Sequence, residues 1–311
     1  MRKGPPQRSL GVEAGWRTNG TAPSRRMRLQ FLNAAGARLS HAAGMFVPCE
    51  GRAPLDFKGW TLLLPAVSVG NVGQLAVDLV ISTLGMSKIG YFYTDCLVPM
   101  IGNNPYATTE ENATELCINS EVYAAPSKKL VVLQIRSPFL KNKYRPFCQT
   151  LLLWVKSCGF AKTVVLSSSY AYQCNDQQLQ GTSLRYLLSP AVEKTCGSVM
   201  EKLSGRELEK VAAFPGLNDD EKTYHIPGGG ITKVLFSESC SKGIPLVVLL
   251  KFCSEGDNIP DALTLADYLN EWLQLTANQQ QTGSCSLQSL RWKIPSSWKL
   301  LFGSGLPPAL F

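Results

Sequence analysis

The sequence predicts an α/β fold in which a mostly parallel sheet is covered by helices on both faces, which makes three layers. Strand-sized apolar runs alternate along the chain with segments of helical period. These runs are continuous rather than alternately apolar and polar, which is typical of strands buried on both faces. With 45% hydrophobic and 17% charged residues among 311, the chain can bury a sizeable core. Right-handed crossovers would make the layer doubly wound.

The first predicted unit is a strand over residues 61–67 followed by a helix over residues 70–84. Apolar residues recur in the second segment at the spacing of one helix face. They are Val72, Leu75, Ala76, Leu79 and Val80. Gly85 is expected to end this helix, and further strands are expected over residues 88–94 and 130–136.

The second half of the chain continues the alternation. A helix is predicted over residues 145–157, ending at Gly159, and apolar strands are predicted over residues 162–168 and 246–253. The last predicted helix covers residues 260–275. Its apolar face consists of Leu265, Leu269, Trp272 and Leu273.

Residues 45–302 are expected to form a single α/β domain. Within it, residues 190–222 are a possible helical insertion on the rim of the sheet, and residues 276–290 are expected to form a polar surface loop. Two appendages flank the domain: a disordered basic extension over residues 1–44 and a C-terminal tail over residues 303–311.

The extension carries most of the net charge. Residues 1–44 hold eight Lys or Arg and one Glu, whereas the rest of the chain holds 23 bases and 22 acids. Two alternatives stay open for this segment: a mitochondrial transit segment, or a solvated extension before a second start at Met45. A secretory signal is excluded because the segment has no apolar stretch of that type.

Composition also argues against several kinds of partner and cofactor. The domain lacks the basic excess that neutralises phosphates, so no nucleic acid is expected as a partner. No run of about 18 uninterrupted apolar residues exists, so no membrane span is expected. The ten cysteines include no CxxC pair and no zinc-ligand spacing. We therefore expect reduced cysteines inside the cell and no metal or other cofactor.

Catalytic chemistry has few candidates. The histidines are His41 and His225, so any Ser-His-Asp or Cys-His site in the domain would have to use His225. The chain contains no GxSxG, P-loop or GxGxxG sequence. No catalytic residue is therefore predicted.

Two loops could nevertheless bind a ligand. The first contains three consecutive glycines before a possible helix start: Gly228, Gly229 and Gly230. They could present N–H groups to a phosphate or carboxylate, or they could form a tight turn that lets the backbone pack closely.

The second loop follows the strand over residues 246–253, at the edge where α/β folds place ligands. Its carboxylates are Glu255, Asp257 and Asp261. Asn71 and Asp95, near the ends of the first two strands, could line the same crevice. The alternative is that Asp257 or Asn258 caps the following helix and the rest of the loop is solvated.

The C-terminal tail is apolar, unlike most chain ends. Leu306, Leu310 and Phe311 follow a Gly/Ser hinge, and two prolines stiffen the segment toward an extended form. Such a tail suits capture of a C-terminus by a partner's pocket. It could equally pack on the core of its own domain, and both alternatives stay open.

Six blocks of the sequence resemble the proteasome assembly chaperone 2 family, and the resemblance runs over residues 45–311. The blocks are MFVPC (45–49), LPAVSVGNVGQLA (64–76), SKIGYFYTDC (87–96), IPGGGITK (226–233), SEGDNIPDA (254–262) and FGSGLPPALF (302–311). The resemblance implies a fold similar to that of purine nucleoside phosphorylases and a chain that is not an enzyme.

The same resemblance implies the partners. Members of this family form a heterodimer with proteasome assembly chaperone 1, bind proteasome α subunits, promote formation of the α ring and prevent off-pathway dimerisation of α rings. It also implies a cytoplasmic and nuclear location. The rival hypothesis is a nucleoside- or anion-binding enzyme on the same fold, with Gly228–Gly230, Glu255 and Asp257 as its site.

Partners in this family use tails that end in a hydrophobic residue, a tyrosine and any residue, and that enter pockets between α subunits. The partner-binding residues implied here are Leu306, Ala309, Leu310 and Phe311. Leu310 stands where the tyrosine is expected, so the hydroxyl contact is absent. Insertion of this tail into a pocket between α subunits would then be weak, or the tail of the partner chaperone would supply most of the binding.

Overall fold

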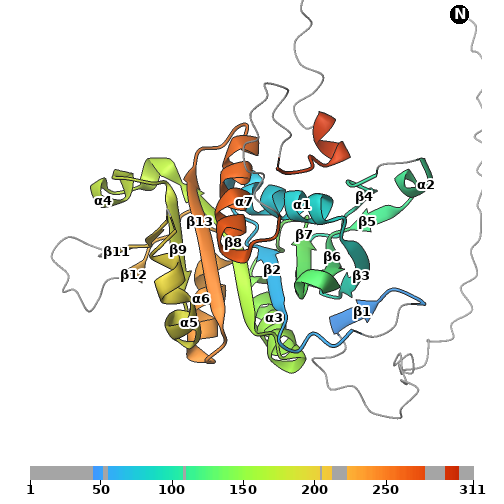
Figure 1. The fold of residues 1–311 in the computed structure, drawn as a ribbon, viewed down its shortest axis with the longest axis horizontal. Coiled ribbons are helices and arrows are strands. Elements are labelled where there is room, and N and C mark those ends of the chain that lie inside the picture. The colour runs from blue at the N-terminus through green and yellow to red at the C-terminus, as the bar shows by residue number, and fades with distance from the viewer. Residues whose placement is uncertain are drawn as a thin grey trace, which may run out of the picture. The chain divides into compact units, whose positions relative to one another are not determined.

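The computed structural model describes residues 45–51, 55–107, 110–203, 205–211, 223–276 and 291–300. These residues form an α/β unit around a nine-stranded sheet with helices on both faces (Figure 1). The predicted three-layer architecture is confirmed. The predicted extension (1–44) and tail (303–311) lie outside the described residues, as do residues 277–290 of the predicted polar loop.

The main sheet combines a parallel centre with antiparallel sides. From one edge to the other its strands are β1 (Phe46–Pro48), β3 (Ser87–Phe92), β6 (Ser120–Ala125), β7 (Leu130–Ile135), β2 (Thr61–Pro65), β8 (Lys162–Tyr170), β13 (Leu246–Cys253), β9 (Leu184–Leu188) and β10 (Arg206–Glu207). Strands β7, β2, β8 and β13 run parallel, as the continuous apolar runs predict. Strands β6 and β9 pair antiparallel with β7 and β13 and extend this centre on either side.

Helices cover both faces of the sheet. The helices α1 (Val72–Leu84), α5 (Pro190–Met200) and α7 (Ile259–Leu273) bury apolar side chains against one face. The helices α3 (Tyr144–Cys158) and α6 (Thr232–Ser241) do so against the other face. Figure 1 shows α1 and α7 side by side. Among the described residues, no helix is long and apolar enough to cross a bilayer.

Smaller elements stand around the main sheet. They are the ribbon of β4 (Ile101–Asn103) and β5 (Leu116–Ile118), the ribbon of β11 (Lys210–Val211) and β12 (Thr223–Tyr224), the short helices α2 (Glu110–Ala113) and α4 (Asp176–Leu179), and the 3-10 turns η2 (Val69–Asn71), η3 (Pro126–Lys128), η4 (Ala171–Gln173) and η6 (Ser296–Leu300). Of the predicted insertion over residues 190–222, α5 is helical, β10 joins the main sheet as its last strand, and residues 212–222 lie outside the described part.

The core has one cluster on each face of the sheet. In β2, Leu62 and Leu64 belong to the cluster under α3 and α6, whereas Leu63 belongs to the cluster under α1 and α7. This alternation follows the two-residue period of a strand. Trp154 of α3 anchors the first cluster, with its ring centroid 5.3 Å from that of Phe92. The central strands therefore join two apolar layers.

Helix ends follow the predicted glycine pattern at two positions. Gly85 and Gly159 end α1 and α3 in the left-handed conformation, with φ of +54° and +66°. The last helix ends at Leu273 instead of the predicted residue 275, and Gln274 takes the left-handed position. A residue other than glycine can do this at a modest conformational cost.

Candidate functional site

The glycine turn lies in the crevice where sequence analysis placed a candidate site, next to the end of β2. Gly228 and Gly230 have φ of +73° and +56°, which favours glycine. The N–H of Gly229 donates to a carbonyl three residues earlier, and the N–H of Ile231 donates to the Ala66 carbonyl at 3.1 Å. A Cβ on Gly230 would collide with the same Ala66 oxygen. The structure therefore supports the tight-turn alternative over an anion cradle.

Serines of β8 occupy the crevice from the sheet side. The Ser168 hydroxyl lies 2.7 Å from the Ser68 hydroxyl and 2.5 Å from the Val69 carbonyl oxygen. The Ser167 hydroxyl lies 2.6 Å from that of Thr232, the first residue of α6. All four hydroxyl-bearing residues are buried. Their hydrogen bonds join the strand to the loops and do not point to a ligand.

The acidic loop after β13 does not gather its carboxylates. The Tyr170 hydroxyl donates to Glu255 at 3.1 Å, and this bond raises the pKa of the phenol. Asp257 accepts the N–H of Ile259 at 3.1 Å, so it caps α7 as one of the predicted alternatives states. Asp261 pairs with Lys251 at 3.3 Å.

Asn71 and Asp95 were expected to share one crevice, and the structure separates them. Asn71 and Glu255 line an open hollow of about 470 Å³ beside η2. Asp95 is not part of that lining and instead pairs with Lys143 at 2.9 Å, before α3. The prediction for Asp95 was wrong because β3 is not a neighbour of β2: β6 and β7 lie between them in the sheet.

Other catalytic groups are sparse in the described part. His225 is exposed after β12. Among the described residues, no three His, Cys, Asp or Glu side chains are grouped closely enough to hold a metal ion. The crevice is thus a set of structural hydrogen bonds around a modest hollow.

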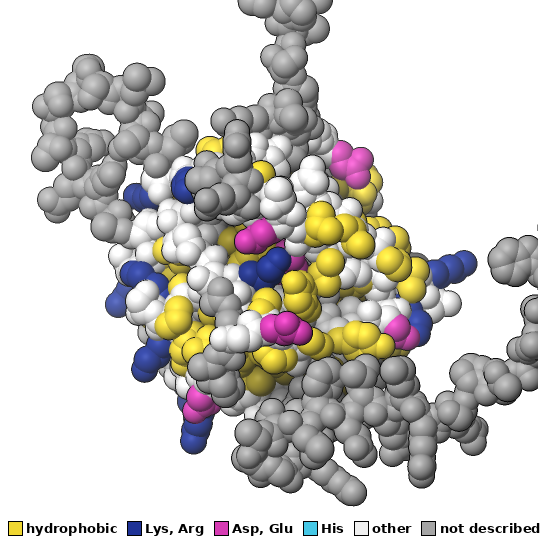
Figure 2. Space-filling view, turned by 90° about the vertical axis from the view of Figure 1, so that its right-hand side faces the viewer, with side chains coloured by type: hydrophobic (Ala, Val, Ile, Leu, Met, Phe, Trp, Pro, Cys, Tyr) yellow, Lys and Arg dark blue, Asp and Glu magenta, His cyan; other side chains and the backbone are white. Residues whose placement is uncertain are grey.

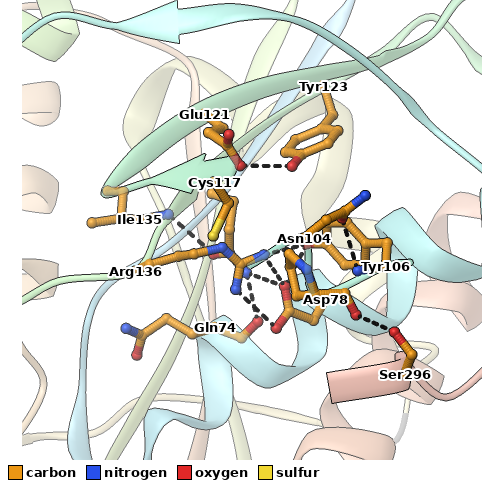
Figure 3. Close-up of polar contacts among 12 residues, drawn as sticks. Gln74, Asp78, Asn104, Tyr106, Cys117, Glu121, Tyr123, Ile135, Arg136 and Ser296 are labelled. Carbon is orange, nitrogen blue, oxygen red and sulfur yellow. Dashed lines mark hydrogen bonds and ion pairs between the residues drawn. The ribbon is translucent and has the colours of Figure 1, made fainter. Parts of the chain in front are cut away.

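A buried polar cluster that sequence analysis missed lies between α1, β7 and the chain after β4 (Figure 3). Asp78 accepts hydrogen bonds from Arg136 Nη2 at 2.9 Å and from Gln134 Nε2 at 2.6 Å. The Tyr106 hydroxyl donates to Asp78 and accepts from Arg136 at 2.7 Å. The side chains of Asp78 and Arg136 are 8% and 14% exposed, so this is a buried ion pair with polar support.

The electrostatics of this cluster keep it charged. Burial alone lowers the pKa of Arg136, but the Asp78 carboxylate outweighs burial and holds that pKa above its ordinary value. Burial, followed by the same carboxylate, raises the pKa of Tyr106 well above its ordinary value. The phenol therefore stays protonated and donates, while the guanidinium stays cationic.

A second buried acid lies close by on β6. Glu121 is 1% exposed, accepts from Tyr123 at 2.7 Å and pairs with Lys88 at 3.3 Å. Burial, followed by Glu121, raises the pKa of Tyr123. Lys88, Glu121 and Tyr106 line a hollow of about 260 Å³ between α1, β3 and the β4–β5 ribbon. Lys88 and Glu121, two of the charged residues that line it, pair with each other.

The segment over residues 291–300 is fastened next to this cluster. The Trp292 indole N–H donates to Asp267 of α7 at 2.9 Å, and the Lys293 N–H donates to the Thr83 hydroxyl at 2.8 Å. The Ser296 hydroxyl, shown in Figure 3, donates to the Pro105 carbonyl at 3.0 Å. The chain that leads to the predicted tail is thereby held beside α1 and the loop after β4.

The β4–β5 ribbon exposes an apolar face. Ile101 lies opposite Ile118, and Asn103 lies opposite Leu116, so these four side chains share one face and Cys117 takes the other. Ile101 and Leu116 are 71% and 58% exposed, whereas Cys117 is 6% exposed. We call Ile101, Leu116 and Ile118 the outer ribbon face.

Further apolar side chains are exposed along the neighbouring chain: Tyr93, Val98, Leu140 and Tyr144. Figure 2, which looks onto the side where β3, β4 and β5 lie, shows apolar side chains gathered there with a few charged ones among them. Apolar patches rimmed by polar groups are typical of protein interaction sites. The predicted tail residues (Leu306, Ala309, Leu310 and Phe311) lie outside the described part, so their role stays a prediction.

The family is decided by sequence comparison. A family model described as the PAC2 family matches residues 62–281, which is more than two thirds of the chain. The chain belongs to the PAC2 family. The resemblance identified from the sequence blocks is confirmed.

Relatives within the PAC2 family align over most of this chain. It is 63% identical over 267 residues to the Homo sapiens protein named proteasome assembly chaperone 2, covering 86% of this chain and 100% of that protein. A Nematostella vectensis protein of the same name is 47% identical over 237 residues, covering 75% of this chain and 97% of that protein.

Solved structures share the fold. Pyrococcus furiosus PbaA, described as an archaeal homolog of proteasome-assembly chaperone, superposes with a TM-score of 0.53 at 15% identity over 75% of this chain and 82% of that one. Pyrococcus furiosus PbaB, described as an archaeal proteasome activator, superposes with a TM-score of 0.51 at 15% identity. The match covers 73% of this chain and 88% of that one. At this identity the likeness concerns the fold alone.

Proposed function

We propose that this PAC2-family chain is a proteasome assembly chaperone. It forms a heterodimer with proteasome assembly chaperone 1, and the pair binds proteasome α subunits. The pair promotes formation of the α ring and prevents off-pathway dimerisation of α rings. In this role the chain is not an enzyme and uses no cofactor, and it works in the cytoplasm and nucleus.

The observation that carries the proposal is the relationship to proteins named proteasome assembly chaperone 2, at 63% identity over 86% of the chain for the human one. The match covers the whole length of that human protein. The exposed apolar side chains around β3, β4 and β5 add a physical reason for a protein partner, because such surface gains free energy when it is covered.

The arrangement of the crevice favours this proposal over the rival nucleoside- or anion-binding enzyme. The glycine turn directs the Ile231 N–H at the Ala66 carbonyl, and the serines of β8 bond to neighbouring loops. Glu255 contacts a tyrosine and Asp257 caps a helix. Calorimetry with inorganic phosphate and with nucleosides tests the rival: we expect no heat of binding. Saturable heat that is lost in Glu255→Gln would favour the enzyme.

Co-expression tests the proposed partners. The full chain is produced with proteasome assembly chaperone 1 and α subunits, purified through a tag on this chain, and weighed intact by native mass spectrometry. We expect a one-to-one chaperone pair and larger species containing α subunits. Recovery of this chain as a lone, stable monomer in the presence of both partners would contradict the proposal.

The tail is tested in the same preparation. Deleting residues 306–311 should leave the chaperone pair intact and weaken retention of α subunits. Leu179→Ser, which removes an exposed apolar side chain on α4, is a matched control that should change neither. If the deletion leaves α-subunit binding unchanged, the tail of this chain does not contribute to that binding, and the tail of the partner chaperone supplies the contact.

The cellular location is tested by fractionation and by mapping the mature N-terminus. We expect the chain in cytoplasmic and nuclear fractions. A mature N-terminus inside residues 1–44 or near Met45, found in a mitochondrial fraction, would favour the transit alternative.

A further inference from the structure

Much of the outer ribbon face is left uncovered by the described residues of its own fold, although Ile118 is half-buried. Ile101 and Leu116 are 71% and 58% exposed, although both belong to strands whose opposite face is packed. Cys117, on that packed face, donates to the Asn103 carbonyl and is buried. The ribbon is thus a two-stranded platform with apolar side chains directed away from the core.

The chain itself brings a segment to this platform. The Ser296 hydroxyl and the Ser297 N–H both donate to the carbonyl of Pro105, at 3.0 and 3.2 Å. Pro105 stands two residues after β4 ends. Trp292 and Trp298 are 3% and 5% exposed, so this segment is anchored by buried side chains as well as by hydrogen bonds. Leu300 therefore starts the remaining chain close to the ribbon.

The remaining chain has the composition and the reach to cover the platform. Residues 301–311 contain Leu301, Phe302, Leu306, Leu310 and Phe311, together with two glycines. Ile101 lies four residues before Pro105, which is at most roughly 14 Å of extended chain. Residues 301–311 can span up to roughly 36 Å when extended. They carry no Asp, Glu, Lys or Arg, so no charged side chain would be desolvated on apolar surface.

We propose that residues 301–311 fold back onto the outer ribbon face in the free chain. Apolar side chains of the segment cover Ile101 and Leu116, and this removes apolar area of both from water. The consequence for regulation rests on the proposed function: a segment held on the ribbon is not available to an α subunit. Binding to α subunits then exposes the ribbon, and the two positions of the tail exclude each other.

Hydrogen exchange of the full chain tests this inference without any α subunit. The intact chain is compared with Phe302→Ser/Leu306→Ser/Leu310→Ser, which keeps the length and removes three apolar side chains. We expect peptides covering residues 98–118 to exchange several-fold faster in the variant. Peptides around Tyr172 and Leu179, which are also exposed and apolar, are the internal control and should not change.

Three results would overturn the inference. Equal exchange over residues 98–118 in both chains would show that the segment does not cover the ribbon. Protection that rises with protein concentration would assign the face to a second copy, and protection that appears only with proteasome assembly chaperone 1 would assign it to the heterodimer. A photo-crosslinker at position 306 gives an independent readout: an intramolecular link to residues 98–118 is expected. Binding of α subunits is measured in a separate experiment. Failure of the proposed function can therefore be told apart from failure of this inference.

Discussion

At the scale of single residues, the buried pair of Asp78 and Arg136 is a contact whose loss should be costly. Arg136→Met keeps an unbranched side chain but leaves the Asp78 carboxylate without its cation, next to Gln134 and Tyr106. Breaking a buried ion pair in this way costs about 3–5 kcal/mol. We expect a loss of that order in the free energy of unfolding by urea, followed by tryptophan fluorescence.

The exposed pair of Asp95 and Lys143 provides the control for this substitution. Its N–O distance is also 2.9 Å, but the two side chains are 77% and 40% exposed. Solvent screens such a pair, so Lys143→Met should change the free energy of unfolding little. Equal losses in the two variants would mean that burial does not set the strength of the Asp78 pair.

The buried thiol of Cys253 predicts a pH dependence. Burial, followed by the nearby Asp261, raises the pKa of this thiol from its ordinary value of 9.0 to about 11. Because the thiolate forms more readily in the unfolded chain, the stability from Cys253 is complete below pH 9 and falls as pH rises toward 11. In urea unfolding at pH 8, 9 and 10, the free energy of unfolding should fall less steeply with pH in Cys253→Ala than in the unchanged chain. Equal slopes of the free energy of unfolding against pH in the two chains would contradict this prediction.

At the scale of elements, Gly230 is the position in the turn before α6 where a side chain would meet backbone most closely. Gly230 has φ of +56°, and a Cβ there would meet the carbonyl oxygens of Ala66 and Val67. Gly243, with φ of +63°, has nothing within 4 Å of its Cβ position. Gly243→Ala should therefore cost only the left-handed strain, about 1–2 kcal/mol. Gly230→Ala should cost clearly more by thermal or urea unfolding. Similar losses of stability in the two variants would show that the turn can shift to accommodate a Cβ at position 230.

The elements that the sequence predicted are those with long apolar patterns. The predicted strand over residues 61–67 is β2, and the helix predicted over residues 70–84 is α1, because each pattern reports one buried surface. The β4–β5 ribbon was not predicted. Its strands have three residues each and are too short for a pattern to stand out. Their stability comes from tertiary contacts, which local sequence does not encode.

The candidate site shows the same limit. Asp78 bonds to Tyr106 and Arg136, which are 28 and 58 residues away along the chain, so only the folded topology brings them together. A signal was present: Asp78 stands between Val77 and Leu79, and Arg136 follows an apolar strand. A charge inside an apolar pattern indicates a buried partner. The prediction for Asp95 failed because the order of strands along the chain does not give their order in the sheet.

At the scale of the whole molecule, the central strands should make the two core clusters unfold together. Leu64 and Leu166 are both 0% exposed and lie in opposite clusters, on the neighbouring strands β2 and β8. Truncating a buried leucine to alanine costs about 2–5 kcal/mol. Leu64→Ala and Leu166→Ala should each shift one shared transition, whether read by fluorescence of Trp154 and Trp292, which lie in opposite clusters, or by circular dichroism. Separate transitions in Leu166→Ala would mean that the α1–α7 layer can come apart while the α3–α6 layer stays folded.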